Sequence, residues 1–366
     1  MVEKNLAIVT MSYGSNYGNK LQNYAMQFIY ETMGFNVETI RMKPVVEYTS
    51  SFGDKFKNID KKIVKRIRRI IYKKNIFERI KNFKEFDDLY LKFSEHEFLM
   101  NSYESLNNEK YQFYSVGSDQ VWNSYFDEFS PIFLLDCLDD SKVRISYAAS
   151  FGCNSINPNY KEIFEKELKK FKAISVRENE GQELIESFEN LSAEVVLDPT
   201  LLLEKKYWDQ LSEKSKFIKE KKYILTYFLG EIESDLENCI KKYSIEKNLE
   251  IINLNKISNS YYSIGPIEFV DMIKKAELIF TDSFHACCFS ILYEKLFWVV
   301  TRNSVKKNMN SRIITLLKNT DLEERWWDSK VNVESIPNYK KSLEKLEIFR
   351  ERSLAFLNKA LNMEKK

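Results

Sequence analysis

Short apolar runs alternate with longer amphipathic segments along most of this chain. Residues 5–12 form an apolar run that predicts a buried strand, and a Gly- and Asn-rich stretch at 13–19 predicts a loop. Residues 20–33 then show helical periodicity, which ends at Gly34 because glycine is typical just past a last helical turn. An apolar run at 37–42 predicts the next strand. Strand, loop, helix and strand in this order are typical of a parallel α/β sheet.

The same alternation continues in two series. The runs that predict strands lie at 112–116, 144–151, 173–176 and 194–197, and then at 223–230, 249–255, 276–282 and 296–302. A polar segment at 204–222 separates the two series and is expected to be a crossover. We therefore predict an α/β fold of two Rossmann-like domains facing each other across a cleft, residues 1–200 and 201–335. A helix within 336–366 is expected to pack back across both domains.

Residues 53–85 depart from this alternation. Apolar side chains recur there every three or four residues, and Lys and Arg fill most of the remaining positions. This pattern predicts an amphipathic basic helix, or a pair of helices, inserted in the first domain. The segment either packs on the sheet with its charges solvated, which we favour, or makes peripheral contact with an anionic membrane.

Composition narrows the function classes. The 366 residues include 56 basic and 54 acidic side chains, so global charge gives no reason to expect a nucleic-acid partner. The five cysteines, at positions 137, 153, 239, 287 and 288, have neither disulfide-framework nor metal-ligand spacing, and a reducing cytoplasm is the simplest location. The first apolar run is too short for a signal peptide, and no run of 18 apolar residues occurs.

The candidate chemistry lies in the segment 281–286, between a predicted strand and a predicted helix. His285 stands at this turn, where the amides of a helix N-terminus can hold an anion. It is one of only two histidines and is better placed for proton transfer than His96, which we expect on the surface. The alternative is a capping segment with a buried histidine that is satisfied structurally. Signatures of dinucleotide, P-loop and zinc-protease sites are missing from the sequence, and no metal site is predicted.

Five segments occur in the order seen in a known family. They are Asn16–Ala25, Gly117–Asn123, Tyr147–Gly152, Ile174–Glu178 and Thr281–Ala286. In these segments the chain resembles the polysaccharide pyruvyl transferase family, over roughly residues 5–325. Many members carry Arg two places before the histidine and Gly directly after it, where this chain has Ser283 and Ala286.

The resemblance implies a fold like that of GT-B glycosyltransferases and a defined reaction. Pyruvate would pass from phosphoenolpyruvate to a sugar diol of a surface or capsular polysaccharide or its precursor, giving a pyruvyl ketal and phosphate. It implies phosphoenolpyruvate as co-substrate without a further cofactor, and a glycan or lipid-linked sugar as acceptor. The expected location is the cytoplasm, with the inner membrane surface as an open alternative. Two other functions stay open, namely a nucleotide-sugar glycosyltransferase of the same fold and a non-catalytic glycan-binding relative.

On the phosphoenolpyruvate side, which we assign to the second domain, His285 would protonate the methylene carbon and accept a later proton. We expect it protonated in the substrate complex, because the charge of a bound phosphate outweighs the opposing helix N-terminus. Arg177, at a strand end, can grip carboxylate or phosphate, although an ion pair with a carboxylate is the alternative. Ser283 and the amides near Phe284 could contact phosphate, and a plain helix cap is compatible with that.

On the acceptor side, polar residues follow the first-domain strands. The predicted sugar contacts are Tyr17, Asn19, Gln22, Ser118, Gln120, Trp122 and Asn123. Asp119 either accepts a proton from the attacking hydroxyl or caps its turn. For Trp122 we favour packing over a sugar platform. Four cations follow the last strand, namely Arg302, Lys306, Lys307 and Arg312. They either supply further positive charge to the site or lie on a solvated surface, which we favour for each.

Overall fold

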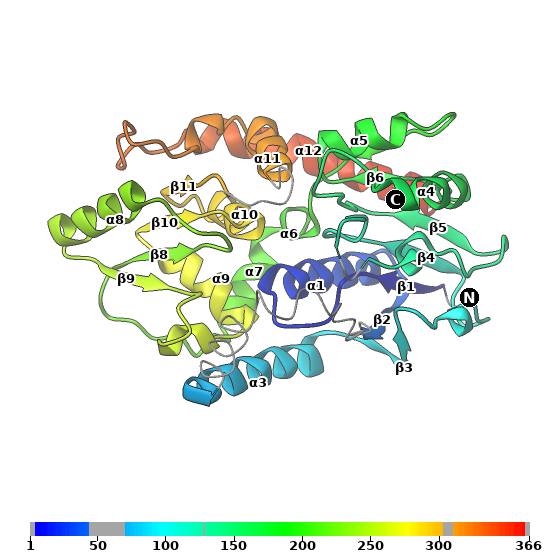
Figure 1. The fold of residues 1–366 in the computed structure, drawn as a ribbon, viewed down its shortest axis with the longest axis horizontal. Coiled ribbons are helices and arrows are strands. Elements are labelled where there is room, and N and C mark those ends of the chain that lie inside the picture. The colour runs from blue at the N-terminus through cyan, green and yellow to red at the C-terminus, as the bar shows by residue number, and fades with distance from the viewer. Residues whose placement is uncertain (1–3, 44–69, 127–128, 303–309, 363–366) are drawn as a thin grey trace, which may run out of the picture.

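Two parallel sheets, one per domain, form the centre of the molecule (Figure 1). The computed structural model describes residues 4–43, 70–126, 129–302 and 310–362. The first sheet has the order β3-β2-β1-β4-β5 and the second the order β11-β10-β8-β9. The predicted α/β fold of two Rossmann-like domains is therefore confirmed.

The first sheet grows outward on both sides of the N-terminal strand. Its members are β1 (Asn5–Val9), β2 (Asn36–Lys43), β3 (Phe93–Leu99), β4 (Phe113–Val116) and β5 (Val143–Ser146). Leu6 pairs with Val37 on one side and with Phe113 on the other. Strands β6 (Ser175–Val176) and β7 (Glu194–Val195) form a small sheet that continues this domain. Bridges from Ile145 to Ala173 and from Ala149 to Val176 connect it to the end of β5.

The second sheet is built around two fully buried strands. It contains β8 (Tyr223–Tyr227), β9 (Glu250–Asn253), β10 (Leu278–Thr281) and β11 (Phe297–Val299). All residues of β8 and β10 are buried, as expected for a parallel sheet with both faces covered by helices. The break between the sheets falls between Val195 and Tyr223. The domain boundary placed at residue 200 stays a prediction.

Most helices lie close to where the periodicity predicts them. They are α1 (Tyr17–Thr32), α3 (Lys73–Tyr90), α4 (Lys161–Leu168), α5 (Asn179–Glu186), α6 (Pro199–Leu202), α7 (Lys205–Ser212), α8 (Ser234–Lys247), α9 (Pro266–Lys275), α10 (Phe284–Leu292), α11 (Ser311–Thr320) and α12 (Tyr339–Ala360). Among the residues that the structure describes, no helix is both long and apolar enough to cross a bilayer.

Three local predictions need correction. Helix α1 begins at Tyr17 rather than residue 20, because the Asn16 side chain accepts from the amides of Gly18 and Asn19 and so caps the helix within the predicted loop. Strand β3 was not predicted, since it lies at the edge of the sheet and is mostly polar. The polar crossover contains α7, whose first turn starts at Lys205.

The C-terminal helix α12 returns from the second domain to the first, as predicted (Figure 1). The Ser353 hydroxyl accepts from the Leu197 amide at 3.0 Å, and the Arg350 guanidinium donates to the Leu201 carbonyl at 3.0 and 3.2 Å. This helix therefore holds the segment that follows β7, which later supplies a site residue.

On the opposite side of the molecule, α3 joins the same two domains (Figure 1). It buries Phe83 and Phe86. Asn75 and Asn82 donate to carbonyls of the second domain, those of Ile257 and Ser263, each at 2.7 Å. The part of the predicted basic helix at 53–69 lies outside the described residues. Helix α3 packs on α9 and on residues 260–263, so the choice between packing on the sheet and membrane contact stays a prediction.

Arg79 is the main polar connection made by α3. Its Nη1 donates to the Tyr17 hydroxyl and to the Tyr262 carbonyl, both at 2.7 Å, while Nη2 donates to the Ser15 carbonyl at 2.9 Å. The guanidinium centre also lies 4.5 Å from the Tyr17 ring centroid. One buried cation thus ties the start of α1 to the second domain.

Replacing Arg79 with alanine removes this cation and leaves three acceptors without their donor. We expect Arg79→Ala to lose about 3 kcal/mol of stability, because hydrogen bonds to charged groups contribute about 1.5–3 kcal/mol and unpartnered buried acceptors add to the loss. Urea unfolding followed by tryptophan fluorescence measures the change. Lys81→Ala, an exposed change on the same helix, is the matched control with an expected effect within about 0.5 kcal/mol. Equal stability of the two variants would contradict the role of Arg79.

Candidate active site

His285 lies in the first turn of α10, directly after β10. Ser283 is the N-cap of this helix, and its hydroxyl accepts from the Ala286 amide at 3.5 Å. The imidazole is buried and faces the first turn of α1 in the other domain. A Cβ atom added to Gly18 would lie 1.9 Å from Nδ1 and 2.6 Å from Cγ of His285. Only a glycine at position 18 leaves room for this ring.

Asp198 connects the two domains at this point. Its Oδ2 accepts from Arg177 Nη1 at 2.7 Å and from the Ser118 hydroxyl at 3.0 Å. The same oxygen lies 3.6 Å from His285 Nε2, which is an ionic contact when the imidazole is protonated. Its Oδ1 accepts from the amide and hydroxyl of Thr200, which fixes the carboxylate at the start of α6.

A second carboxylate and a second guanidinium adjoin this pair. Asp119 Oδ1 accepts from Arg177 Nη2 at 3.2 Å and lies 3.9 Å from Arg312 Nη1. The Phe284 ring covers both cations, since the guanidinium centres of Arg177 and Arg312 lie 4.3 and 5.9 Å from its centroid. These contacts bring together α10, α11 and the strand ends of the first domain.

The ionisation of these groups follows from burial and from their neighbours. Burial alone would raise the pKa of Asp119, but Arg177, His285 and Arg312 lower it below its ordinary value. Burial would likewise raise the pKa of Asp198, but His285 and Arg177 lower it well below the usual range. Burial and the nearby Arg177 lower the pKa of Arg312 to about 10. At neutral pH the centre therefore holds two carboxylates and two guanidiniums beside the imidazole.

Several residues singled out from the sequence do meet here. The structure brings His285, Phe284, Arg177, Ser118 and Asp119 together from segments that are far apart in the chain. Their roles in binding and proton transfer stay predictions. Asp119 also accepts from the amide of the next residue at 2.9 Å, so it caps its own turn as the alternative interpretation expects.

Three predicted sugar contacts are placed in the interior instead. Trp122 is fully buried, packs on Phe151 and donates through Nε1 to the Phe133 carbonyl at 2.8 Å. The Tyr17 ring stacks on Phe269 with centroids 4.4 Å apart. Protein covers the faces of both rings. Trp122 therefore packs as the favoured interpretation expects, and Tyr17 is corrected to a packing residue.

The third is Gln22, which is also fully buried. Its Nε2 donates to the Thr10 hydroxyl at 3.1 Å, and its Oε1 accepts from the Ser118 amide at 3.1 Å. It lies in α1, within the helix that the sequence predicts. We correct it to a link between α1 and the loop that follows β4.

The other predicted contacts have mixed positions. Gln120, with its amide oxygen toward Arg312, lies 2.6 and 2.9 Å from the two terminal guanidinium nitrogens. Asn123 accepts from the Tyr125 amide and caps that turn. Asn19 is buried, and its Oδ1 has no hydrogen-bond partner in the described part of the chain, so its sugar contact stays a prediction. Ser283 is used by its helix cap.

Sequence reasoning missed Asp198 as a site residue and misplaced Arg302 and Arg312. Asp198 follows β7 as Arg177 follows β6, and this shared position at a strand end was the available signal. Arg312 is buried beside Asp119, and the Arg302 side chain lies 3.0 Å from Asp282, so neither belongs to a solvated surface. Lys306 and Lys307 lie outside the described residues.

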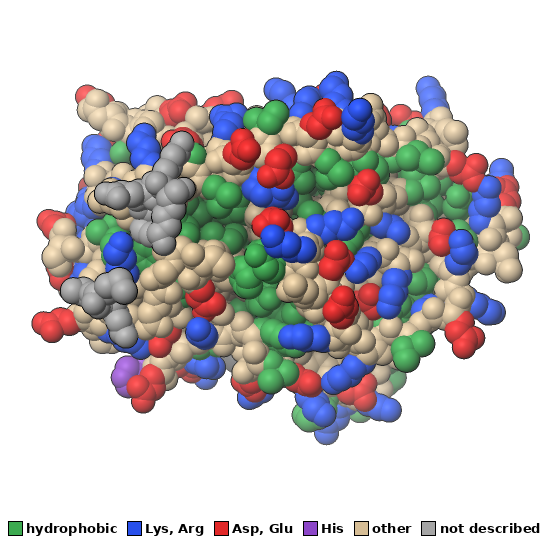
Figure 2. Space-filling model, turned by 180° about the vertical axis from the view of Figure 1, so that it is seen from behind, with side chains coloured by type: hydrophobic (Ala, Val, Ile, Leu, Met, Phe, Trp, Pro, Cys, Tyr) green, Lys and Arg blue, Asp and Glu red, His purple; other side chains and the backbone are tan. Residues whose placement is uncertain are grey.

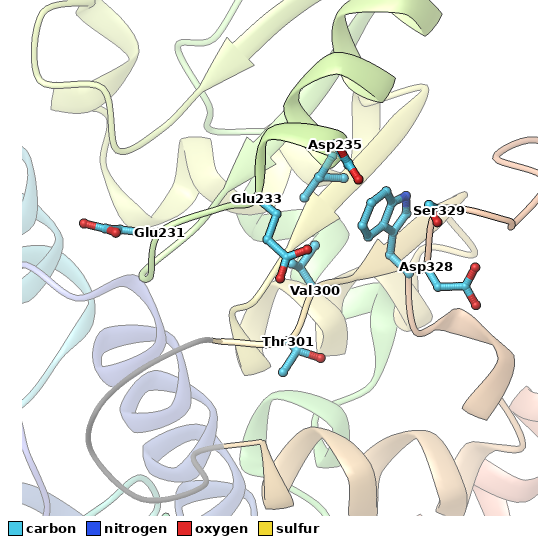
Figure 3. A pocket seen from close by; sticks show the side chains of 9 residues that line it. Glu231, Glu233, Asp235, Val300, Thr301, Asp328 and Ser329 are labelled. Atoms are coloured by element: carbon cyan, nitrogen blue, oxygen red, sulfur yellow. The ribbon is translucent and has the colours of Figure 1, made fainter.

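A cavity of about 260 Å³ lies beside the start of α8 in the second domain (Figure 3). Its lining includes Glu231, Glu233, Asp235 and Asp328. Four carboxylates around one cavity repel a phosphate group. Within the described ranges, no group of three or more His, Cys, Asp or Glu side chains is arranged to hold a metal ion.

The backbone amides of the loop after β8 already donate hydrogen bonds within the protein. The amides of Leu229 and Gly230 donate to the Asp282 carboxylate at 2.7 and 2.8 Å. Arg302 binds the same carboxylate through Nε at 3.0 Å. A protein carboxylate therefore occupies the place where this loop could hold an anion.

Comparison with known proteins gives a family and a set of similar folds. The family model described as Polysaccharide pyruvyl transferase matches residues 16–304. No curated protein matches the chain in sequence.

Similar solved structures include UDP-N-acetylglucosamine 2-epimerase from Rickettsia bellii, with TM-score 0.49, 8% identity and coverage of 97% of this chain and 96% of that chain. UDP-GlcNAc 2-epimerase from Methanocaldococcus jannaschii has TM-score 0.48, 12% identity and coverage of 94% and 92%. The wall teichoic acid polymerase TagF has TM-score 0.41, 13% identity and coverage of 97% and 90%.

The matched range contains most of the candidate site. It includes Gly18, Asp119, Arg177, Asp198 and His285, and it leaves out Arg312. Because the family model covers well over half of the chain, this protein belongs to the polysaccharide pyruvyl transferase family.

Proposed function

We propose that this protein transfers pyruvate from phosphoenolpyruvate to a diol of a glycan and forms a cyclic ketal. The observation that carries the proposal is the buried contact between Asp198 of the first domain and His285 of the second, beside two guanidiniums. The family gives the substrate class, a polysaccharide. The charge arrangement supports a small anion as its partner.

Phosphoenolpyruvate carries a carboxylate and a phosphate, and so needs positioned cations and amides. Arg177 and Arg312 share the Phe284 ring and are the cations nearest to His285. Arg177 is ion-paired with Asp198 and Asp119, as the alternative interpretation expects, so it would bind such a group by exchanging one of these carboxylates. In this chain Ser283 takes the place of a common family arginine and caps α10 instead. We propose that Arg312, reaching in from α11, supplies the second guanidinium.

The proposed reaction begins with a proton from the His285 imidazolium to the methylene carbon. The neighbouring carbon becomes electrophilic, and the first sugar hydroxyl adds to it while its proton returns to His285. The bond from this carbon to the phosphate oxygen then breaks, and the second hydroxyl closes the ring. One hydroxyl proton ends on the new methyl group and the other on the released phosphate. Asp198, anionic beside Nε2, stabilises the imidazolium electrostatically.

The rival nucleotide-sugar function is supported less well by the second domain. A nucleotide diphosphate would need cations or open amides near the strand ends. The acidic cavity beside α8 repels phosphate, and Asp282 already takes the amides after β8. A non-catalytic relative would not need a histidine held within 3.6 Å of a buried carboxylate.

The direct test is phosphate release from phosphoenolpyruvate in the presence of candidate glycans. We expect release with wild-type protein and a loss of about 10³-fold or more in His285→Gln, since a positioned proton donor contributes about 10²–10⁴-fold. His96→Gln, at the exposed histidine of β3, is the matched control and should keep full activity. Near-normal turnover of a folded His285→Gln protein would exclude the proton-transfer role. Transfer from a nucleotide sugar, with no phosphate released from phosphoenolpyruvate, would exclude the function.

Gly18 gives a second test, because its missing side chain makes room for the imidazole. Gly18→Ala would place a carbon 1.9 Å from Nδ1, so the whole ring must move. We expect kcat to fall about 100-fold, as a displacement near 1 Å can produce. Stability should fall by about 1–2 kcal/mol, because overpacking against a buried ring costs about 1–3 kcal/mol and the helix preference of Ala over Gly offsets about 1 kcal/mol of it. Gly181→Ala, in the first turn of α5 with its nearest contact at 3.3 Å, should change kcat only a few-fold. Equal activity of both variants would argue against this fit.

Peripheral membrane contact through 53–85, the less favoured alternative in the sequence, is compatible with the packing of α3 and is proposed in addition to it. Its described portion exposes Ile70, Phe77 and Ile80 beside Lys73 and Lys81, and Figure 2 shows basic and hydrophobic side chains side by side at the lower edge, where α3 runs. We expect flotation with vesicles containing phosphatidylglycerol but not with pure phosphatidylcholine. Phe77→Glu should reduce that flotation. Equal recovery with both vesicle types would reject the contact.

A further inference from the structure

A cavity of about 360 Å³ lies between the two domains, next to the start of α1. Its walls include Ser15 and Asn16 before α1, Arg79 and Ile80 on α3, and Leu229 and Asn255 after strands β8 and β9. The size is within the range of small-molecule sites, about 300–1,000 Å³. Strand ends at a domain interface are also where α/β proteins commonly bind ligands.

Both walls of this cavity are attached to the proposed catalytic centre. On one side, the Asn16 side chain caps the turn that contains Gly18, and Gly18 touches the His285 ring. On the other side, Tyr227 lines the cavity and pairs with Thr281, whose hydroxyl donates to the Tyr227 carbonyl at 2.6 Å. A ligand in the cavity would therefore lie beside the segments that hold His285.

The chemistry of the cavity suits an uncharged, polyhydroxylated ligand. The Ser15 hydroxyl and the Asn255 Oδ1 form no hydrogen bond with any described residue. Burial raises the pKa of Tyr227 to about 12, so its phenol is neutral at physiological pH. Arg79 is the one charged residue among the described residues that line the cavity, and it already donates to three protein acceptors.

This character differs from the surroundings of His285 and from the cavity beside α8. The surroundings of His285 hold buried guanidiniums, and the cavity beside α8 is lined by carboxylates. Sugar hydroxyls need paired donors and acceptors, while the C–H faces of the ring pack on apolar groups such as Ile80 and Leu229. Of the surroundings of His285, the cavity beside α8 and this cavity, only this cavity offers hydrogen-bonding groups and apolar groups without a free charge. The comparison covers the described residues.

We propose that this cavity binds the glycan acceptor, with sugar contacts from Ser15, Asn255 and Tyr227. This inference rests on the proposed function. It moves the acceptor site from the interior positions of Tyr17, Gln22 and Trp122 to the opening between α1, α3 and the second sheet. The sugar would approach the phosphoenolpyruvate centre along the first turn of α1.

The test fills the cavity with a large side chain, once from α3 and once from the loop after β8. Ile80→Trp and Leu229→Trp place a large side chain in it, and Phe77→Trp adds the same bulk to the exposed side of α3 as the control. Saturation-transfer NMR with the methyl glycosides of glucose, galactose and mannose reports sugar binding without any reaction. Broadening of the phosphorus signal of phosphoenolpyruvate in the same samples reports the anion site.

We expect sugar signals with wild type and Phe77→Trp, and their loss by five-fold or more in both filled variants. Phosphoenolpyruvate broadening should be the same in all four proteins. Unchanged sugar signals in the filled variants, or none with wild type, would overturn the acceptor site. Missing phosphoenolpyruvate broadening in wild type would instead count against the proposed function, whatever the sugar signals show.

Discussion

A carboxylate buried where two domains meet is the interaction on which the site depends. An ionised carboxylate out of water needs opposing charges and hydrogen bonds, since desolvation alone is strongly unfavourable. Asp198 obtains them from Arg177, Ser118 and Thr200 within its own domain. Its remaining neighbour is His285 of the other domain, at 3.6 Å. The ionic contact between His285 and Asp198 therefore forms only when the two domains lie close together.

Two helices, α12 and α3, keep the two domains at this distance from opposite sides of the molecule. Helix α12 holds the segment before Asp198 through Ser353, and α3 holds the start of α1 through Arg79. Apolar packing is continuous between them, because the Tyr17 ring lies against Phe269 within one core that spans both domains. The imidazole can therefore rest on Gly18 without a side chain between them. Arg79 acts on this geometry as a positioning residue.

Sequence patterns could predict the two sheets, because buried parallel strands appear as apolar runs separated by helical periodicity. They also placed His285 and Arg177 at strand ends, where the structure has them. They failed where a side chain's surroundings depend on distant segments. Tyr17 and Gln22 belong to a polar motif, yet packing from other elements covers them. Arg312 looked like surface charge because its partner Asp119 is almost two hundred residues earlier in the chain.

The central claim is that the His285 imidazole, beside Asp198, faces a trianionic enol phosphate between the domains. A crystal structure of the protein with phosphoenolpyruvate bound tests it most directly. The account predicts the phosphate and carboxylate on Arg177 and Arg312, with the methylene carbon about 3–3.5 Å from a ring nitrogen of His285. A ligand bound elsewhere, or one whose methylene carbon is turned away from the imidazole, would contradict it.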